Sequence, residues 1–246
     1  MQLDLHYTDP RLVAVYDAEN AGRDDIEFYL RLASALRAGR VTDLGCGTGV
    51  LAAELGAAGF TTTGVDPAAA MLDYARHRSG GEIVTWIDGE ASVLESGSAD
   101  LIIMTGHVAQ VFLTDDGWSR VLTECARALT PRGYLAFEVR NPDRAAWEGW
   151  TRAQTTDRYQ LPGGGSFESW VQVTDVRGDL VDFEGHTVLA DADELVAAST
   201  LRFRTRAEVE ESLLAAGLLT TAVYGDWNSG PVTPTAPELI FLAQRP

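Results

Sequence analysis

The stretch Val41-Thr42-Asp43-Leu44-Gly45-Cys46-Gly47-Thr48-Gly49 decides the fold. It begins as a short apolar strand and ends in three glycines that are separated by one residue each. A helical pattern follows directly, because apolar residues recur at the spacing of one helix face from Val50 to Ala58. Glycine lets another molecule approach the backbone closely, and free N–H groups at a helix start attract polar groups. We therefore expect a strand, a glycine turn and a helix that bind a cofactor of the adenosine type.

The glycine spacing bears on which cofactor binds. A dinucleotide fingerprint reads G-x-G-x-x-G and holds a pyrophosphate at the helix N-terminus. Here the third glycine comes one residue early, and a carboxylate at the strand end faces the space that a pyrophosphate needs. A carboxylate suits a ligand with an ammonium group, such as S-adenosylmethionine. The alternative is a glycine turn that only lets the helix pack closely on the strand. The cofactor contacts expected in this stretch are Asp43, Gly45, Cys46, Gly47 and Gly49.

The composition limits the chemistry. The chain has 246 residues, a net charge of −17 and 19 basic residues, all of them arginine. The absence of lysine excludes a Schiff-base lysine for pyridoxal phosphate, a Walker-type phosphate lysine and a lysine general base. The acidic balance argues against nucleic acid or an anionic membrane as a partner, because both require basic patches. The length fits one α/β domain with an elaboration.

Cysteine usage and hydropathy point to a cytoplasmic protein. The two cysteines, Cys46 and Cys125, suggest neither a disulfide framework nor a metal site, so we expect no bound metal. The first ten residues carry no apolar signal-peptide core, and no segment approaches transmembrane length.

Two helices are predicted before the first strand, in an N-terminal helical cap of residues 1–39. Asp9-Pro10 has the residue types of a helix start, and a second helix is expected at about residues 24–38. These helices either cover the edge of the sheet or lie over the cofactor. In the second arrangement Tyr16 contacts the cofactor and Tyr7 binds the substrate.

An acidic residue follows the second predicted strand, residues 60–65. Asp66 stands at its carboxyl end, and Pro67 opens the next helix. A carboxylate at this position can accept hydrogen bonds from both ribose hydroxyls of an adenosine ligand. It can also cap the helix, and the two roles use different lone pairs.

A second acidic group follows the third predicted strand, residues 83–87. We expect Glu90, or else Asp88, to accept the adenine amino group, while the Ala91 N–H donates to a ring nitrogen. The alternative is an exposed acidic turn around Gly89.

The fourth predicted strand, residues 99–105, ends with Thr105 and leads to His107. In open α/β sheets, ligands bind outside the carboxyl ends of the strands. We therefore expect Thr105 to contact the cofactor and His107 to act as a general base or to orient the substrate. A purely structural histidine is the alternative. No acidic pair accompanies His107, so a metal-assisted mechanism is not supported.

Strands and helices alternate up to a fifth strand, residues 134–139, which predicts a doubly wound, mainly parallel sheet. Glu138 lies in that strand, and Arg140 follows it as a candidate substrate-binding residue. A helix at residues 206–216 begins with a capping box. The strands predicted at 218–224 and 238–244 form a final pair that adds one antiparallel strand to the sheet.

Residues 154–203, within a predicted insertion of residues 142–204, lack a long helical period. Four β-like runs are expected there, with connections at Pro162-Gly163-Gly164-Gly165-Ser166, Arg177-Gly178-Asp179 and Ala190-Asp191-Ala192-Asp193. They predict an inserted antiparallel sheet that forms a substrate lid or a dimer surface. Its aromatic residues, Trp147 and Trp170 among them, either line a substrate pocket or form the core of that sheet. His186 is a secondary candidate for the base. The predicted runs are residues 157–161, 167–176, 180–189 and 195–203.

With these residues in place, the chain resembles the class I S-adenosylmethionine-dependent methyltransferases. Residues 43–49 resemble the first motif of that family, and Val65-Asp66 resembles its ribose-binding position. Gly89-Glu90-Ala91 resembles the usual Gly-Asp-Ala adenine site, with Glu in place of Asp. Residues 129–133 resemble the turn before the fifth strand. The insertion resembles that of small-molecule methyltransferases in architecture only.

This resemblance implies a seven-stranded Rossmann-like sheet in residues 40–141 and 205–246, with S-adenosylmethionine as the cofactor. It also implies direct displacement, in which an O or N atom of a small molecule attacks the methyl group. His107 is then the candidate base, followed by His186, Glu138 and Tyr16, although a neutral amine acceptor needs no base. A nicotinamide-dependent oxidoreductase and a non-catalytic binding module are the alternatives. The oligomer is expected to be a monomer or a homodimer, and the sequence does not identify the acceptor.

Overall fold

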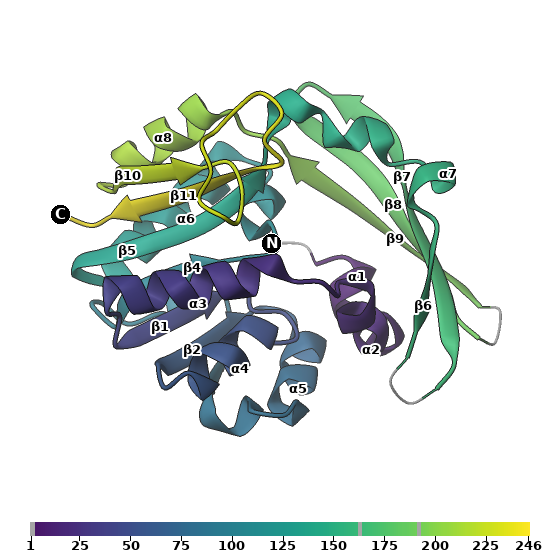
Figure 1. Ribbon diagram of the computed structural model, residues 1–246, viewed down its shortest axis with the longest axis horizontal. Coiled ribbons are helices and arrows are strands. Elements are labelled where there is room, and N and C mark those ends of the chain that lie inside the picture. The colour runs from purple at the N-terminus through teal and green to yellow at the C-terminus, as the bar shows by residue number, and fades with distance from the viewer. Residues whose placement is uncertain (1–2, 162–163, 191–192) are drawn as a thin grey trace.

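The computed structural model describes residues 3–161, 164–190 and 193–246, and it contains two sheets (Figure 1). The strands of the first sheet are β1 (Arg40–Leu44), β2 (Thr61–Asp66), β3 (Thr85–Asp88), β4 (Ala99–Met104), β5 (Leu129–Arg140), β10 (Leu219–Tyr224) and β11 (Glu238–Gln244). Their order is β10-β11-β5-β4-β1-β2-β3. β11 pairs antiparallel with both neighbours, whereas the other pairs in this sheet are parallel. The predicted seven-stranded, mainly parallel sheet is confirmed.

Helices pack on both faces of this sheet, which confirms the doubly wound arrangement. The helices are α1 (Leu5–Thr8), α2 (Pro10–Glu19), α3 (Asp24–Leu36), α4 (Val50–Ala57), α5 (Ala69–His77), α6 (Asp115–Ala128), α7 (Arg152–Thr155) and α8 (Arg206–Ala215). Ile102 and Ile103 are neighbours in β4 and point to opposite faces. Ile103 joins the buried cluster that α3 and α4 form with the sheet, and Ile102 joins the cluster of α6 and α8.

The second sheet is antiparallel and lies beside the first (Figure 1). It consists of β6 (Asp157–Gln160), β7 (Ser166–Arg177), β8 (Leu180–Val188) and β9 (Glu194–Arg202), in that order. The predicted inserted sheet is therefore confirmed. Pro162, Gly163, Asp191 and Ala192 of the predicted connections lie outside the described residues. The second predicted connection, residues 177–179, is a tight turn at Gly178, whose φ is 65°.

Three predicted boundaries differ from the structure by two residues or more. The third strand begins at Thr85, because residues 81–83 form a 3-10 turn. The second helix ends at Leu36, because Arg37 adopts a left-handed backbone with a φ of 53°. The fifth strand already begins at Leu129, and the expected turn is a bulge within it, since Arg132 has a φ of 66°. Within the described residues, no helix is both long and apolar enough to cross a membrane.

Candidate functional site

Hydrogen bonds to the end of β2 hold the glycine loop between β1 and α4. The Gly45 N–H donates to the Val65 carbonyl at 2.7 Å, and the Gly47 N–H donates to the Asp66 carboxylate at 2.8 Å. Gly45, Gly47 and Gly49 have φ values of 77°, 53° and 78°, in the left-handed region that glycine adopts readily. The loop therefore joins the carboxyl ends of two neighbouring strands.

Packing against Trp86 adds a second requirement for glycine at this loop. The indole Nε1 donates to the Gly81 carbonyl at 2.8 Å. A Cβ atom at Gly49 would lie 2.4 Å from the indole, and a Cβ atom at Gly64 of β2 would also lie 2.4 Å from it. A larger residue at either position would displace Trp86 from the underside of the loop.

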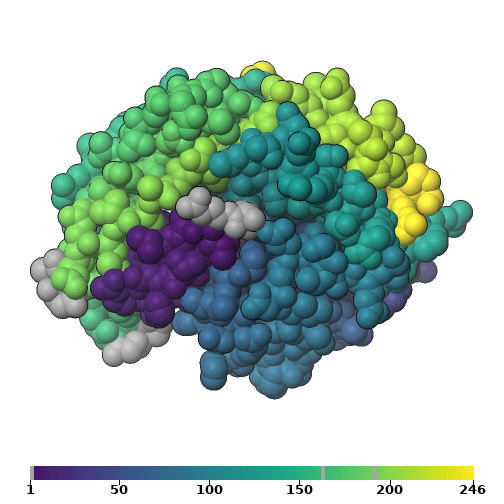
Figure 2. All heavy atoms as spheres, turned by 180° about the vertical axis from the view of Figure 1, so that it is seen from behind, coloured from purple at the N-terminus to yellow at the C-terminus, as the bar shows by residue number. Residues whose placement is uncertain are grey.

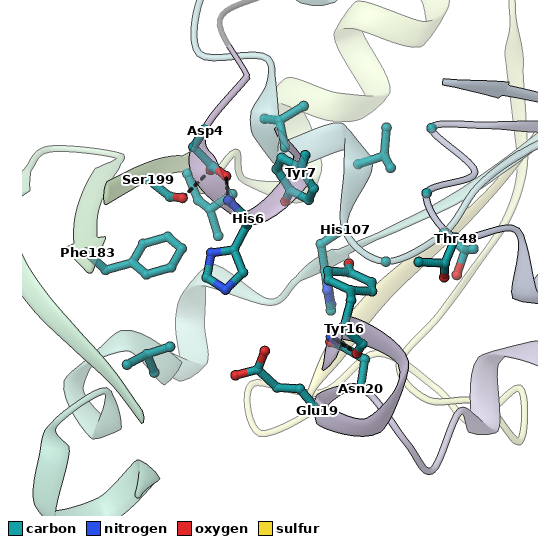
Figure 3. Close-up of a pocket in the computed structure, with 18 of the residues that line it drawn as sticks. Asp4, His6, Tyr7, Tyr16, Glu19, Asn20, Thr48, His107, Phe183 and Ser199 are labelled. Atoms are coloured by element: carbon teal, nitrogen blue, oxygen red, sulfur yellow. Dashed lines mark hydrogen bonds between the residues drawn. The ribbon is translucent and has the colours of Figure 1, made fainter. Parts of the chain in front are cut away.

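A cavity of about 1430 Å³ extends from the glycine loop to the second sheet. Its wall combines the loop, the ends of β1 and β4, helices α1 and α2, and strands β7 to β9. Figure 3 shows His6, Glu19 and His107 around this space. The predicted site residues on the wall are Tyr7, Tyr16, Asp43, Gly45, Cys46, Gly47, Asp66, Pro67, Thr105, His107, Glu138, Arg140 and Trp170. In the part of the chain that the structure describes, the wall does not include Gly49, Asp88, Glu90, Ala91, Trp147 or His186.

Asp43 is a buried carboxylate on this wall. Its exposed fraction is 0 %, and neither carboxylate oxygen has a hydrogen-bond partner among the described residues. Burial raises the pKa of Asp43 to about 7; the Arg23 guanidinium opposes this shift, and the Asp66 carboxylate adds to it. Buried polar groups are usually hydrogen bonded. Asp43 is therefore suited to a positively charged ligand group that the protein itself does not supply.

Asp66 caps two backbone N–H groups. One carboxylate oxygen accepts from Gly47 and the other from Ala68, each at 2.8 Å. The expected capping role is thus present, with Pro67 between the carboxylate and α5. Each oxygen keeps a lone pair, so the expected ribose contact stays a prediction that this geometry allows.

The predicted adenine contacts lie beside the cavity. Asp88 pairs with Asp66 across β2 and β3, and the Gly89 N–H donates to the Asp66 carbonyl at 3.1 Å. Ala91 is buried at the start of a 3-10 turn, whereas Asp88 and Glu90 are exposed. These residues share the sheet edge with Asp66, and their contact with adenine stays a prediction.

Helix α2 is attached to the glycine loop. The Thr48 hydroxyl donates to Asp17 at 2.5 Å, Asp17 also pairs with Arg78, and Arg78 donates to the Thr48 carbonyl at 2.6 Å. Tyr7 and Tyr16 lie on the cavity wall with ring centroids 6.4 Å apart, and burial raises the pKa of both phenols. The N-terminal helices therefore lie over the site, which is one of the two arrangements considered from the sequence.

Helix α1 contacts the second sheet. The Asp4 side chain accepts a hydrogen bond from the Ser199 hydroxyl of β9. The His6 ring lies against Gly185 of β8, where a Cβ atom would be 2.4 Å from the ring. Figure 2 shows the N-terminal residues, in purple, between the second sheet and the α/β domain. The N-terminal segment thus joins the two sheets around the cavity.

The carboxyl end of β4 is also attached to the N-terminal segment. The Thr105 hydroxyl donates to Asp25 at 2.6 Å, and Asp25 pairs with Arg23 at 2.6 Å. Arg23 precedes α3, so this ion pair fixes the start of that helix over the sheet edge. The predicted cofactor contact of Thr105 stays a prediction.

His107 follows β4 with a φ of 64°, which is uncommon for a residue other than glycine. Its N–H donates to Glu138 Oε1 at 2.8 Å, and Glu138 Oε2 accepts from the Tyr29 hydroxyl at 2.5 Å. The His107 Nε2 atom lies 3.0 Å from Glu238 Oε2. Burial, together with the Arg140 guanidinium, lowers the pKa of His107 to about 3, against the opposing effect of the Glu138 and Asp25 carboxylates. The imidazole is therefore neutral near pH 7, and Glu138 holds its backbone.

The predicted substrate residues divide into two groups. Arg140 lies on the cavity wall, donates to Gln110 Oε1 at 3.1 Å, and has its guanidinium carbon 5.3 Å from the centre of the Trp150 ring. Trp147 instead packs on Phe203, with ring centroids 4.4 Å apart. Trp147 therefore belongs to the apolar core beneath the second sheet, which is the alternative that the sequence left open.

His186 and Trp170 are neighbours across β7 and β8, and their rings stack with centroids 4.8 Å apart. Arg152 lies over the Trp170 ring at 4.1 Å, and His186 Nδ1 lies 2.8 Å from Glu194. Successive residues of a strand point to opposite faces, and Gly185 faces the N-terminal segment. His186 and the Trp170 ring stacked on it consequently point away from the cavity, so the expected substrate contact of the Trp170 side chain is not supported. The structure does not bring His186 together with the residues at the end of β4.

Several polar residues on the cavity wall were not predicted. They are His6, Glu19, Arg23, Asp25 and Glu238. Glu238 could have been found from the topology: an antiparallel strand begins at the edge where its parallel neighbours end. No comparable pattern marks the residues that precede the first strand. Among the described residues, no three His, Cys, Asp or Glu side chains form a group that could hold a metal ion.

Comparison with known proteins was made for sequence and for structure. A family profile described as "Methyltransferase domain" matches residues 41–133. The cypemycin N-terminal methyltransferase of Streptomyces sp. is 26% identical over 210 residues, which cover 83% of this chain and 82% of that protein. The putative methyltransferase YqeM of Bacillus subtilis is 26% identical over 117 residues, 46% of this chain and 47% of that protein. The chain therefore matches about half the length of YqeM.

Solved structures agree over nearly the whole chain. The CcbJ methyltransferase from Streptomyces caelestis has a TM-score of 0.77 at 18% identity and covers 97% of this chain and 98% of its own. S-adenosylmethionine-bound CalS10, an amino pentose methyltransferase from Micromonospora echinaspora, has a TM-score of 0.71 at 24% identity, with coverages of 94% and 97%. Residues 41–133 thus match a methyltransferase domain, and the chain has the fold of the S-adenosylmethionine-dependent methyltransferases.

Proposed function

We propose that the protein transfers the methyl group of S-adenosylmethionine to an O or N atom of a small molecule by direct displacement. The observation that carries this proposal is Asp43, a fully buried carboxylate without a hydrogen-bond partner among the described residues, on the wall of the cavity. S-adenosylmethionine carries an ammonium group and a sulfonium group, and a desolvated carboxylate attracts such charges strongly. A pyrophosphate of a dinucleotide would instead be repelled there.

The residues around the glycine loop fit this cofactor. Asp43 would hold its ammonium group, Asp66 its ribose hydroxyls, and the exposed turn at Glu90 its adenine. When bound, the cofactor supplies a methyl group activated by the sulfonium charge. Tyr7 and Tyr16, on helices that contact the glycine loop or the second sheet, would exclude water from that group.

The second sheet is proposed to cover the acceptor as a lid. Its inner face closes the cavity against α1 and α2, which favours a small acceptor over a macromolecule. One structural neighbour is named a sugar N-methyltransferase, KedS8 from Streptoalloteichus sp. ATCC 53650, and this name supports a small acceptor that includes nitrogen. Each part of the chain would then have its own role. Residues 1–39 would act as the cap, residues 40–141 and 205–246 as the cofactor domain, and residues 142–204 as the lid.

His107 is the proposed proton acceptor for an acceptor molecule that must lose a proton. It lies at the sheet edge on the cavity wall, it is neutral near pH 7, and its side chain is 21 % exposed. Glu138 is engaged with the His107 backbone and with Tyr29, so we assign it a supporting role. Arg140 also lies on the wall, near His107, and is proposed to contact the acceptor.

Calorimetric titration tests the cofactor first. S-adenosylmethionine, S-adenosylhomocysteine and NADH would each be titrated into the wild type, Asp43→Asn and Asp100→Asn. Asp100 is a matched control, because it pairs with Arg40 outside the cavity wall. We expect one-site binding of the first two ligands, weakened at least about tenfold by Asp43→Asn and unchanged by Asp100→Asn. Binding of NADH alone would refute the proposal.

A further inference from the structure

We infer that Glu238 is a positioning residue that fixes the imidazole of His107, so that its Nδ1 atom faces the reaction as the proton acceptor. This inference rests on the proposed methyl transfer. It concerns a residue from the last strand of the chain, 131 positions away from the histidine that it contacts.

The sheet topology brings the two residues together. His107 follows the carboxyl end of β4, and Glu238 is the first residue of β11. β11 runs antiparallel to β5, with Glu238 opposite Arg140, so its beginning lies at the edge where β4 and β5 end. The His107 Nε2 atom and the Glu238 Oε2 atom are 3.0 Å apart, and both residues are on the cavity wall.

Two carboxylates hold this histidine by different atoms. Glu138 accepts the backbone N–H of His107, at the left-handed φ of 64°, and is itself bound by Tyr29. Glu238 contacts the ring. Left-handed backbone conformations of residues other than glycine persist where the surroundings determine them and cluster at functional sites. The loop is thus held in one conformation while the ring orientation is set independently by Glu238.

The ring contact also selects a tautomer. A carboxylate at Nε2 favours the form in which Nε2 carries the hydrogen and Nδ1 carries the lone pair. The described residues supply no hydrogen bond to Nδ1, so this lone pair is available to a ligand. Both side chains are mostly shielded, with exposed fractions of 21 % for His107 and 13 % for Glu238, which strengthens a charge-assisted hydrogen bond between them.

The step balances without a further reactant. The lone pair of the acceptor O or N forms the bond to the methyl carbon, and the pair of the breaking C–S bond stays on sulfur as the thioether. The proton of the acceptor moves to His107 Nδ1. The resulting imidazolium lies against the Glu238 carboxylate, which stabilises it. A hydroxyl acceptor can lose its proton to His107 as it attacks, whereas a protonated amine must lose its proton first, because its nitrogen has no lone pair until then.

The charged groups around His107 and Glu238 allow the two side chains to share one proton. Glu138, Asp25, Arg140 and Arg23 face His107, and Arg140, Arg144 and Asp25 face Glu238. Burial raises the pKa of Glu238 to about 7, against the lowering effect of Arg140, and burial lowers the pKa of His107. Interacting groups of this kind titrate as a pair. The pair therefore becomes anionic, and able to accept a proton, near neutral pH.

The test is a nitrogen NMR spectrum of the histidine rings at about pH 9, where the Glu238 carboxyl group is ionised and can accept the Nε2–H hydrogen bond. The spectrum reports the tautomer directly. The signals of His107 are assigned with His107→Gln. We expect at least about a tenfold excess of the Nε2–H form in the wild type and less than about threefold in Glu238→Gln. Glu238→Asp, which keeps the charge, should restore part of the excess. The matched control is Glu194→Gln, which removes a similar contact of His186 on the outer face of the second sheet and should leave His107 unchanged.

An Nδ1–H tautomer in the wild type, or the same tautomer ratio in Glu238→Gln, would overturn the inference. The calorimetric titration of S-adenosylmethionine separates this outcome from failure of the proposed function. A protein that binds S-adenosylmethionine but shows no tautomer preference refutes the pair alone. A protein with the preference but without S-adenosylmethionine binding refutes the methyl transfer on which the role of the pair rests.

Discussion

Asp43→Asn should stabilise the ligand-free protein at neutral pH while it weakens cofactor binding. The substitution removes a negative charge and nearly preserves the shape of the side chain. Asp43 is fully buried, and neither of its oxygens has a hydrogen-bond partner among the described residues. An asparagine is equally unpaired there, so the two proteins differ mainly in the cost of the buried charge.

The magnitude follows from the pKa of Asp43, which burial raises from 3.8 to about 7. A carboxyl group with a raised pKa binds its proton more tightly in the folded state than in the unfolded state. Its penalty is therefore absent below about pH 4, grows as the pH rises, and is complete above about pH 7. One pH unit corresponds to about 1.4 kcal/mol, so the full penalty is about 4 kcal/mol.

Urea unfolding of the wild type and Asp43→Asn, between about pH 4 and pH 8, measures this penalty. The free energy of unfolding of Asp43→Asn, minus that of the wild type, should increase by a few kcal/mol as the pH rises across that range. Asp100 provides a control of opposite sign. Burial raises its pKa, but hydrogen bonds from Arg40 and Gly39 lower it overall, so Asp100→Asn should lose relative stability as the pH rises. A difference between Asp43→Asn and the wild type that is independent of pH would refute the reasoning.

Further predictions concern the glycine loop and the support of His107. Gly49→Ala should destabilise the protein by about 2–4 kcal/mol in urea unfolding, because strain at its positive φ adds to overlap with Trp86. Gly47→Ala should cost only about 1–2 kcal/mol, because no atom would lie within 4 Å of its Cβ; equal losses would contradict the role of Trp86. Tyr29→Phe should cost about 1.5–3 kcal/mol, because it removes a buried hydrogen bond to Glu138, and an unchanged unfolding midpoint would contradict this.

The fold was predictable because its signals are local. Alternating strands and helices, the glycine turn, and the Thr205–Glu208 capping box each depend on residues that are close in sequence, and the structure contains all of them. The candidate cofactor residues could be chosen for the same reason, since Asp43 is the penultimate residue of β1 and Asp66 is the last residue of β2. Their contacts with a cofactor stay predictions. The bulge at Arg132 was missed because pairing with β4 on one side and β11 on the other overrides the local turn preference.

The acceptor side depends on contacts between distant segments. His186 was a reasonable candidate from its alternation in β8, but alternation alone does not tell which face of a sheet is covered. That choice depends on α1, whose His6 lies against Gly185. Glu238, in contrast, lies on the cavity wall but was not predicted, because its strand β11 is inserted between β10 and β5. Neither contact is marked by a local pattern.

The groups that appear unfavourable for folding lie together on one wall. Asp43 is buried without a hydrogen-bond partner among the described residues, His107 has a left-handed backbone, and Glu238 shares the shielded space around that histidine. The buried charge of Asp43 and the left-handed backbone of His107 each lower the stability of the ligand-free protein, and the Asp43 charge becomes favourable with a ligand that supplies a positive charge. The end of β1, the segment after β4 and the start of β11 supply one of these groups each, and the seven-stranded sheet brings the three together. The proposed reaction requires such an arrangement, because the site must be preorganised for a cationic cofactor and for an acceptor that releases a proton.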